Sequence, residues 1–421
     1  MDKKKVVIIG GGITGLSTAV NLLDSQEDLS ITILEKKSYF GGLAASFDHK
    51  GNKIPVFYHH VFSHDDVTHK YLKRFGLFED MVWKRIKMAI VADGKVYNFT
   101  DIFSLLKFDY LSFWGRIRYG LFGAFVFTVM RPETIPENLD AEVWLRSYAG
   151  DEVTEKLFGN LYSRNKYNIP LTALNAKQFA YRLKAREAIG VFGYPRMGLH
   201  RLIEAFEEEL KGMVRTIKNC KVEEIDLINK KICFDGRMES FDILVNTIPL
   251  PEFLRVASGL SKTEIERWKN IKYCPVVSVV VGFKDLLSDH YWLNIFQEEV
   301  HMVVQHSWLF DGYPEKIVWL GRYGASEEDF PLRDAEITAK YIGVIKKYFP
   351  KAKPMWTKVF KERYAEPIYN KDYAKNKPGY KTSIKGVYNA GVAVTYPKIR
   401  NMNTALCSGE EVAKMILADI Q

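Results

Sequence analysis

The sequence predicts an α/β protein with two domains, and three observations lead to this prediction. Its 421 residues are more than one ordinary hydrophobic core accommodates. A short apolar strand at residues 6–9 runs directly into a glycine-rich turn and then a helical pattern. Two long stretches differ in character, because residues 52–192 have a helical, aromatic pattern whereas residues 251–382 contain β-rich runs such as 276–281 and 317–320.

Composition and charge restrict the class of protein. With 47% hydrophobic and 26% charged residues, the chain resembles globular proteins, which excludes the disordered, collagen-like and disulfide-scaffold classes. The formal net charge of +9 suits an anionic substrate or a membrane surface better than a nucleic acid, because the basic residues are dispersed and no nucleic-acid-reading motif is visible. The four cysteines form no C-x-x-C pair, so we expect no zinc site, no disulfide framework and a cytoplasmic location.

The first element is predicted to be a strand and not a targeting segment. Three lysines precede an uncharged run over residues 6–23, which superficially resembles a secretory signal or a membrane span. Four glycines would interrupt an apolar helix in this run, whereas a strand over residues 6–9 followed by a turn accounts for all of them. We therefore expect no cleaved targeting segment.

The turn Gly10-Gly11-Gly12-Ile13-Thr14-Gly15 fits the pattern G-x-G-x-x-G between a strand and a helix. Gly10 permits the tight turn, Gly12 lets the backbone approach a pyrophosphate, and Gly15 lets the helix pack closely on the strand. The unpaired N–H groups at the start of the helix would bind the phosphates. This context predicts a Rossmann-like domain that binds a dinucleotide.

A second strand, over residues 31–34, ends at Glu35, which lies 20 residues after Gly15. A carboxylate at this spacing accepts hydrogen bonds from ribose hydroxyls and repels a 2′-phosphate, so FAD or NAD is favoured over NADP. The alternative is a glycine turn with an unrelated surface glutamate. The strand before the glycine turn, the helix after it, the acidic residue Glu35 and its spacing from Gly15 all fit a nucleotide site.

The residues after Glu35 separate FAD from NAD. They read Lys36-Lys37-Ser38-Tyr39-Phe40-Gly41-Gly42-Leu43-Ala44, and a second glycine pair has no role in a simple nicotinamide fold. Here the chain resembles the flavin amine oxidase superfamily, which includes protoporphyrinogen oxidases, phytoene desaturases and, more distantly, UDP-galactopyranose mutases. In that family the glycine pair contacts the FAD pyrophosphate and ribityl chain, so the resemblance implies FAD as the cofactor.

Two further segments carry the resemblance. Residues 193–199 lead into a helical pattern like the family's entry to its second FAD-domain segment, and strands are expected from Val222 and within 241–249. Residues 386–391 read as a strand and turn before a helix over 403–416, whose positive end would point at the flavin pyrimidine. The contacts to FAD that the resemblance implies are made by Gly10, Gly12, Ile13, Thr14, Gly15, Glu35, Lys36, Gly41, Gly42, Leu43, Val222, Gly391, Met402 and Asn403.

The resemblance also implies how the chain is divided. Residues 1–51, 193–250 and 383–421 would form a discontinuous, Rossmann-like FAD-binding domain. Residues 52–192 and 251–382 would form a mixed α+β substrate domain, with a mixed sheet backed by helices and the flavin at the domain junction.

The segment Phe57-Tyr58-His59-His60 is similar to a histidine-containing segment of UDP-galactopyranose mutases. This analogy places His59 or His60 near the flavin, where a neutral imidazole would hydrogen-bond the ring or transfer a proton. A packed, structural histidine pair is the alternative interpretation. A metal site formed with His64 and His69 is disfavoured, because no cysteine or carboxylate falls at ligand spacing.

Near the C-terminal helix the chain departs from the mutases. Where they carry Tyr-Leu-Asp-Met-Asp, this sequence has Ile399-Arg400-Asn401-Met402-Asn403, without the tyrosine and the acidic pair. The departure argues against mutase chemistry, which needs the sugar held in a defined geometry. Arg400 instead offers a cation close to the expected flavin face.

The uncharged run 121–130, which starts with Leu121 and ends with Met130, lies between Arg118 and Arg131. Ten residues are too few to span a bilayer, but they would reach one leaflet and give access to a lipid-linked substrate. The favoured interpretation is a buried helix that lines the substrate domain.

The leading functional hypothesis is an FAD-dependent oxidoreductase in which flavin N5 accepts a hydride from a C–N or C–C bond. His59, His60 and Arg400 would position the substrate or supply charge. One alternative is a non-redox flavoenzyme resembling UDP-galactopyranose mutase and acting on a nucleotide sugar. Another is a non-catalytic flavin-binding protein at a membrane surface. No motif distinguishes porphyrin, carotenoid, amine and sugar-nucleotide substrates.

Overall fold

The first sheet is parallel and is assembled from segments far apart in the sequence. The computed structural model describes residues 3–185 and 190–420. Its five-stranded sheet has the order β10 (Arg215–Ile217), β2 (Leu29–Leu34), β1 (Lys4–Ile9), β14 (Ile243–Asn246) and β21 (Val387–Asn389). Helices cover both faces of a parallel sheet, so its strands are buried on both faces, as residues 6–9 of β1 and 31–34 of β2 are. The strands predicted at residues 6–9 and 31–34 are confirmed.

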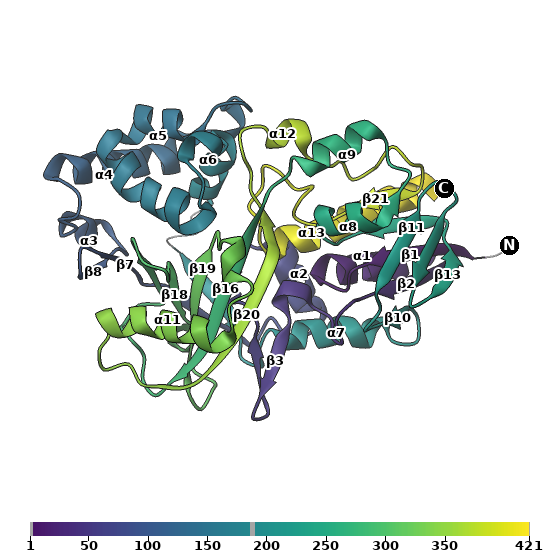
Figure 1. The fold of residues 1–421 in the computed structure, drawn as a ribbon, viewed down its shortest axis with the longest axis horizontal. Coiled ribbons are helices and arrows are strands. Elements are labelled where there is room, and N and C mark those ends of the chain that lie inside the picture. Colours follow the sequence, from purple (N-terminus) through teal and green to yellow (C-terminus); the bar gives the residue numbers. More distant parts are fainter. Residues whose placement is uncertain (1–2, 186–189, 421) are drawn as a thin grey trace.

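Three long helices pack beside this sheet (Figure 1). They are α1 (Ile13–Asp24), α7 (His200–Leu210) and α13 (Met402–Ile420). The crossing of α1 and α13 is close because Gly409 has no side chain, and a Cβ there would lie 2.7 Å from the Thr14 carbonyl oxygen. The helix predicted over 403–416 is therefore confirmed as α13.

A small sheet and two helices complete this part of the molecule. The sheet has the order β13 (Arg237–Ser240), β12 (Lys231–Phe234), β11 (Val222–Asp226) and β15 (Ala257–Ser258). The strand expected from Val222 is β11. Helices α8 (Leu250–Val256) and α9 (Lys262–Lys269) share a hydrophobic core with this sheet through Phe253 and Trp268. Residues 250–269 thus pack on the first domain, although the sequence placed 251–269 in the second.

The second large sheet is mixed, as expected. Its order is β20 (Pro354–Pro367), β16 (Tyr273–Phe283), β19 (Lys316–Tyr323), β18 (Met302–Gln305), β17 (Trp292–Ile295), β7 (Met88–Ala92) and β8 (Lys95–Asn98). Strands β17 and β7 run parallel, and the other neighbours run antiparallel. Helix α11 (Asp334–Tyr348) covers one face through Ile337, Tyr341 and Ile345. The β-rich runs predicted at 276–281 and 317–320 lie in β16 and β19.

A cluster of helices stands at the far end from both chain termini (Figure 1). It contains α3 (Ile102–Leu106), α4 (Phe113–Thr128), α5 (Ala141–Ala149), α6 (Ala176–Lys184) and the π-helix η3 (Val153–Tyr167). These helices have their own core, in which Phe122, Trp144 and Phe158 meet edge to face. The helical, aromatic character predicted for residues 52–192 is confirmed over 102–184, but it is wrong for much of 52–98, which contains several strands, among them β7 and β8.

The run 121–130 is only half buried. Phe122, Val126 and Met130 belong to the core, whereas Leu121 and Val129 are each 67% exposed. The favoured interpretation as a buried helix therefore describes one face of α4, because helical periodicity turns the other face to solvent. Among the described residues no helix has both the length and the apolarity needed to cross a membrane.

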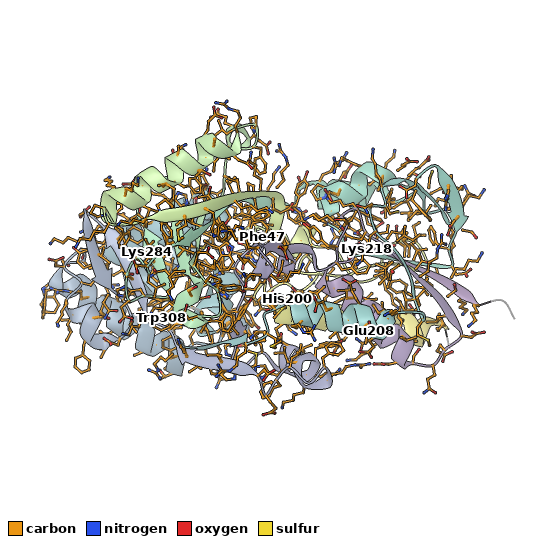
Figure 2. All side chains as sticks on the ribbon, turned by 90° about the horizontal axis from the view of Figure 1, so that it is seen from below. Phe47, His200, Glu208, Lys218, Lys284 and Trp308 are labelled. Carbon is orange, nitrogen blue, oxygen red and sulfur yellow. The ribbon has the colours of Figure 1, made fainter. Side chains whose placement is uncertain are left out.

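The hairpin of β3 (Ser46–His49) and β4 (Asn52–Pro55) lies where the two domains meet. Phe47, labelled at this junction in Figure 2, packs on Trp356 and Phe360 of β20. The remaining elements are β5 (Val61–Phe62), α2 (Asp66–Arg74), β6 (Met81–Arg85), β9 (Val191–Pro195), α10 (His306–Leu309), α12 (Tyr373–Asn376) and short 3₁₀ turns at 42–44, 132–134, 171–173 and 327–329.

Candidate functional site

A cavity of about 820 Å³ extends from the glycine turn after β1 into the second domain. Both domains contribute to its walls, so it lies at their junction, where the flavin was expected. At the glycine end it is lined by most of the predicted cofactor residues: Gly10, Gly12, Ile13, Thr14, Glu35, Lys36, Gly41, Gly42, Leu43, Val222, Gly391 and Met402. At the other end the walls are largely aromatic and include Tyr58, Tyr119, Phe158, Phe192, Trp292 and Tyr323.

Two glycine segments face each other at the cavity wall. Gly12 forms an isolated parallel bridge with Gly41, and a Cβ built on Gly12 would have as its nearest neighbour the Cα of Gly42, 3.9 Å away. Gly10 has a φ of +104°, which favours glycine. Gly15 does not line the cavity, but a Cβ there would lie 2.1 Å from the Gly10 carbonyl oxygen. It therefore permits the close packing of helix on turn that the motif predicts.

Helix α1 begins at the cavity with an open N-terminus. Its N-cap is Gly12, which provides no side-chain hydrogen bond, and no acidic residue occupies the first turn. The first N–H groups of a helix have no intrahelical acceptor and carry the positive end of the helix dipole. This end is therefore suited to an anionic group such as a pyrophosphate.

Glu35 joins the glycine turn to the end of β2. Its carboxylate accepts a hydrogen bond from the Gly11 N–H at 2.7 Å and another from the Lys37 N–H at 2.8 Å. The side chain is buried and lines the cavity. Each carboxylate oxygen has a further lone pair, so hydroxyl groups of a ribose can still bind here. The neighbouring Lys36 is half exposed and pairs with Glu252 at 2.8 Å.

The start of α13 reaches the same cavity. Asn401 caps the helix, because its side-chain oxygen accepts the Thr404 N–H at 2.9 Å. Gly391, whose φ is +107°, donates its N–H to the Ser408 hydroxyl at 2.7 Å and so holds the turn after β21 against this helix. Met402 lines the large cavity, as expected.

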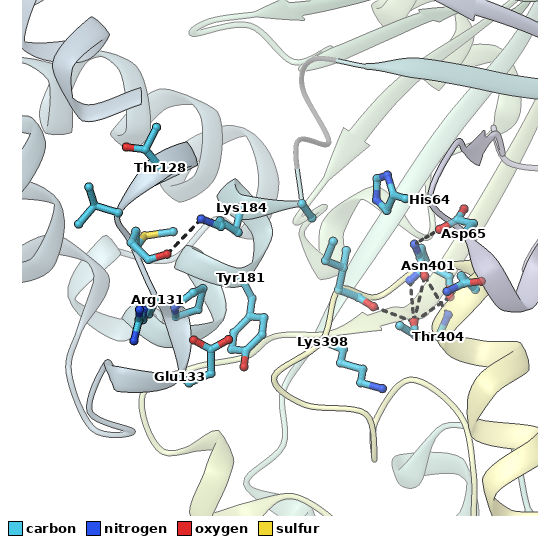
Figure 3. A pocket seen from close by; sticks show the side chains of 16 residues that line it. His64, Asp65, Thr128, Arg131, Glu133, Tyr181, Lys184, Lys398, Asn401 and Thr404 are labelled. Carbon is cyan, nitrogen blue, oxygen red and sulfur yellow. Dashed lines mark hydrogen bonds between the residues drawn. The ribbon is translucent and has the colours of Figure 1, made fainter. Parts of the chain in front are cut away.

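Asn403 does not line the large cavity, although the resemblance placed it at the cofactor. Its side-chain oxygen accepts the Thr68 N–H at 2.8 Å, and its nitrogen donates to Asp66 at 3.1 Å. It lines a second cavity of about 540 Å³ between the C-terminal end of α4 and the start of α13 (Figure 3). Asn401 lines both cavities. The helical spacing of residues 401–403 turns neighbouring side chains to different sides, which explains the difference.

His59 and His60 both line the large cavity and are also packed. Burial lowers the pKa of His59, whose Nδ1 lies 3.0 Å from the Phe57 carbonyl oxygen. His60 stacks on Phe192 with ring centroids 4.0 Å apart, and its Nδ1 lies 3.1 Å from the Tyr291 hydroxyl. Burial, assisted by the neighbouring His59 and His306, lowers the pKa of His60 to about 3. Both imidazoles are therefore neutral at pH 7.

Arg400 lines the cavity, and its guanidinium is paired and almost fully buried. Its side chain is 2% exposed, and its Nε lies 3.3 Å from a carboxylate oxygen of Glu366. The guanidinium also contacts the Tyr167 hydroxyl and the Pro367 carbonyl and lies over the ring of Tyr369. Arg400 is thus held in place by a buried ion pair and aromatic rings.

Lys166 binds the other oxygen of the same carboxylate, at 3.1 Å, and lies over the ring of Tyr323. Arg182 donates to the Tyr167 hydroxyl at 3.2 Å. Burial would raise the pKa of Glu366, but Arg400, Lys166 and Arg182 together outweigh it and hold this pKa at about 2. Sequence reasoning missed Lys166, Arg182 and Glu366, because no local motif connects them with Arg400.

The residues at the glycine end fit an elongated dinucleotide cofactor. The gap between Gly12 and Gly42 is a cradle that side chains would fill, the helix N-terminus is uncapped, and Glu35 supplies an acceptor. No cluster of three or more possible metal ligands occurs among residues 3–185 and 190–420. The arrangement therefore supports chemistry by a bound organic cofactor at the boundary with an aromatic chamber.

Comparison with known proteins agrees with this geometry. The sequence model of the family described as flavin containing amine oxidoreductase matches residues 13–417. A coproporphyrinogen III oxidase from Staphylococcus aureus (strain NCTC 8325 / PS 47) is 26% identical over 331 residues, which are 68% of this chain and 69% of that protein.

Solved structures share the fold over the whole chain. A protein from Exiguobacterium sp. 255-15, provisionally assigned as a protoporphyrinogen oxidase, has a TM-score of 0.82 and 18% identity, with 100% of both chains covered. Reduced UDP-galactopyranose mutase has a TM-score of 0.77 and 18% identity, covering 99% of this chain and 94% of that one. At these identities the structural similarity establishes the fold alone.

Proposed function

The chain belongs to the flavin-containing amine oxidoreductase family and is an FAD-dependent oxidoreductase, and from this premise we propose that it oxidises a C–N or C–C bond of an organic substrate held in the aromatic end of its cavity. FAD supplies the acceptor in such a reaction, in which a hydride passes from the substrate to flavin N5. The family membership confirms the resemblance predicted from the glycine motifs.

The main support for the proposal is that one continuous cavity connects the two ends of the site. The glycine cradle lies at one end and an aromatic chamber at the other, so one ligand in each end would meet within the same enclosed space. The aromatic side chains of Tyr58, Phe192, Trp292 and Tyr323 would displace water from around a bound substrate, which would strengthen electrostatic interactions there.

The protein's own groups would hold and orient the reactants. Gly10, Gly12 and Gly42 leave room for the pyrophosphate, and Glu35 accepts from the ribose. The positive end of α13, at Met402, would stabilise negative charge on the reduced cofactor. His59 and His60, both neutral, would orient ligands as hydrogen-bonding groups and not as fixed charges.

We keep the division into domains as part of the proposal, with one adjustment. Residues 1–51, 193–250 and 383–421 contain all strands of the five-stranded sheet, and residues 52–192 and 251–382 contain all strands of the seven-stranded sheet. Because β15 pairs with β11, and α8 and α9 share a hydrophobic core with it, we assign the segment up to residue 269 to the FAD-binding domain.

Anaerobic mixing tests the proposal. The oxidised holoprotein is mixed with porphyrinogens, polyenes, amines and sugar nucleotides while flavin absorbance is followed. Bleaching by one class, with stoichiometric product, is expected. Turnover of a sugar nucleotide only after prior flavin reduction, with no net redox change, would instead support mutase-type chemistry. An absence of bleaching by all classes, with FAD bound, would count against the oxidase.

A peripheral contact with membranes is a second part of the proposal, supported by an exposed apolar face. Phe103 and Trp114 are 73% and 75% exposed, and the face, which extends over α3 and α4, comprises Ile102, Phe103, Leu106, Phe113, Trp114 and Leu121. Lys107, Arg116 and Arg118 stand beside it, and they complement anionic headgroups.

Liposome flotation tests this contact. Vesicles containing anionic lipid should carry the protein upward, and the double variant Phe103→Ser, Trp114→Ser should stay at the bottom. Met355→Ser is the matched control, since Met355 is an exposed apolar residue on β20, away from this face. Equal flotation of all three proteins would reject the contact.

A further inference from the structure

Two cations share one carboxylate at the wall of the substrate end of the cavity. Arg400 and Lys166 contact different oxygens of Glu366, at 3.3 and 3.1 Å, and all three side chains line the cavity. The side chains of Glu366 and Lys166 are 12% and 15% exposed. The three side chains are therefore largely buried and carry an excess of one positive charge, without counting Arg182 beside them.

Such an excess is costly unless an anion balances it. Transfer of a charge out of water is unfavourable, and pairing offsets the cost only when the charges match. Glu362, another carboxylate that lines the cavity, accepts the N–H of Tyr364 at 3.2 Å and forms no ion pair with Lys166 or Arg400 among the described contacts. The ion pairs among residues 3–185 and 190–420 thus leave one positive charge of Lys166 and Arg400 unbalanced at this wall.

Neutral donors surround the same place. The hydroxyls of Tyr58 and Tyr323 lie 2.7 Å apart, so one donates to the other and one proton is left for a ligand. Burial raises the pKa of both, so both remain protonated. Aromatic side chains form the adjoining wall, including Trp292, whose ring meets that of Tyr58 edge to face at 4.9 Å. A ligand here would meet cations at one end and apolar rings along its body.

We propose that Lys166, Arg400 and Glu366 form a subsite for a carboxylate of the substrate, which would be an organic acid with an apolar body. The inference rests on the proposed function, because it assigns a substrate class to the same chamber. It disfavours cationic amines, which the excess positive charge repels, and uncharged hydrocarbons, which leave that charge unbalanced.

A matched set of ligands tests the subsite without turnover. The probes are 2-naphthoate, 2-naphthamide, 2-naphthylmethylamine and 2-naphthyl phosphate, which share one apolar body. Dissociation constants are measured from the perturbation of the flavin absorption of the oxidised holoprotein. We expect 2-naphthoate to bind on the order of tenfold more tightly than the amide, and the amine to bind least. Tighter binding of the phosphate than of 2-naphthoate would overturn the assignment to carboxylates.

Two variants that change the net charge of the subsite in opposite directions distinguish a role in ligand binding from a purely structural role. Lys166→Gln removes the excess charge, so the preference for 2-naphthoate over the amide should fall to near unity. Glu366→Gln increases the excess, so this preference should rise. Lys414→Gln, on the exposed side of α13, is the control and should leave it unchanged. A purely structural cluster would change the affinities for acid and amide equally in both variants.

The outcomes distinguish this inference from the proposed function. Selective binding of 2-naphthoate without bleaching by any substrate class would support the subsite and count against the oxidase. Bleaching by an amine or a hydrocarbon without selective acid binding would support the oxidase and overturn the subsite.

Discussion

At the scale of single residues, His306 shows how strongly the interior of the second domain opposes charge. The ring is fully buried between Tyr194 and Trp319, and neither ring nitrogen has a hydrogen-bond partner within the described part of the chain. Burial therefore lowers its pKa to about 3. Sequence reasoning chose the histidines at 59–69 and did not single out His306, because nothing in its neighbourhood marks it as buried.

Replacing this ring should make stability less sensitive to acid. The pKa of His306 is about 3 in the folded protein and about 6.5 in an unfolded chain, so between these values the unfolded state binds the extra proton. Stability is therefore lost as the pH falls through this window, by about 1.4 kcal/mol per pH unit for one group. His306→Phe should reduce the loss between pH 6.5 and 5 by about 2 kcal/mol in urea unfolding of the holoprotein. Parallel pH profiles for wild type and variant would contradict this expectation.

Two glycines of one motif should respond differently to the same substitution. Gly12→Ala places a methyl group in open space facing Gly42, with φ at −73°, so the protein should fold normally but retain FAD roughly tenfold less well. Gly15→Ala places a methyl group against the Gly10 carbonyl and should lower stability even without the cofactor. The absorbance ratio at 450 and 280 nm measures FAD retention, and circular dichroism measures folding. Equal effects of both variants on folding would contradict the assigned roles.

At the scale of secondary-structure elements, the end of α4 depends on a side chain from another helix. Lys184, at the end of α6, donates to the carbonyl oxygens of Val126, Phe127 and Met130 at 3.1, 3.4 and 3.1 Å. Carbonyls in the last turn of a helix have no intrahelical partner, and a cation there also interacts favourably with the helix dipole.

Removing this contact should loosen the helical cluster. Lys184→Met should reduce the free energy of unfolding by about 1–3 kcal/mol, because several carbonyls lose a charged donor. Limited proteolysis should then cut near α4 faster than in the wild type. Lys414→Met, which removes an exposed lysine from α13, provides the comparison and should change little. Identical cleavage patterns in both variants would show that Lys184 does not hold α4.

Local sequence patterns predict some of the secondary-structure elements and miss others. The strands and helices around residues 6–35 follow from local periodicity and glycine spacing, and they are found as predicted. The π-helix η3, with 15 residues, was not predicted, because π-helices are rare and occur mostly as single-turn bulges within α-helices. Lys166 lies near the end of η3 and meets Glu366 of β20 only through tertiary packing, so no spacing in the sequence could pair them.

At the scale of the whole molecule, one cavity connects the two domains, so occupancy of one end should stabilise both. FAD that binds only the folded state raises stability by about 2.7 kcal/mol at a free concentration one hundred times its dissociation constant. Hydrogen exchange of the apoprotein and the holoprotein should therefore show added protection in β1 and α1 and also around residues 57–60, which line the same space. Protection confined to the glycine turn would show that the domains respond independently.

The interleaved origin of the two large sheets has a consequence for synthesis on the ribosome. Strand β7 precedes its parallel neighbour β17 by some two hundred positions, and β21 joins β14 only after most of the chain has been translated. A nascent polypeptide would therefore leave the exit tunnel with unfinished sheet edges in both halves. The edges of both sheets stay unpaired until their later strands have been made, and unpaired edges favour aggregation.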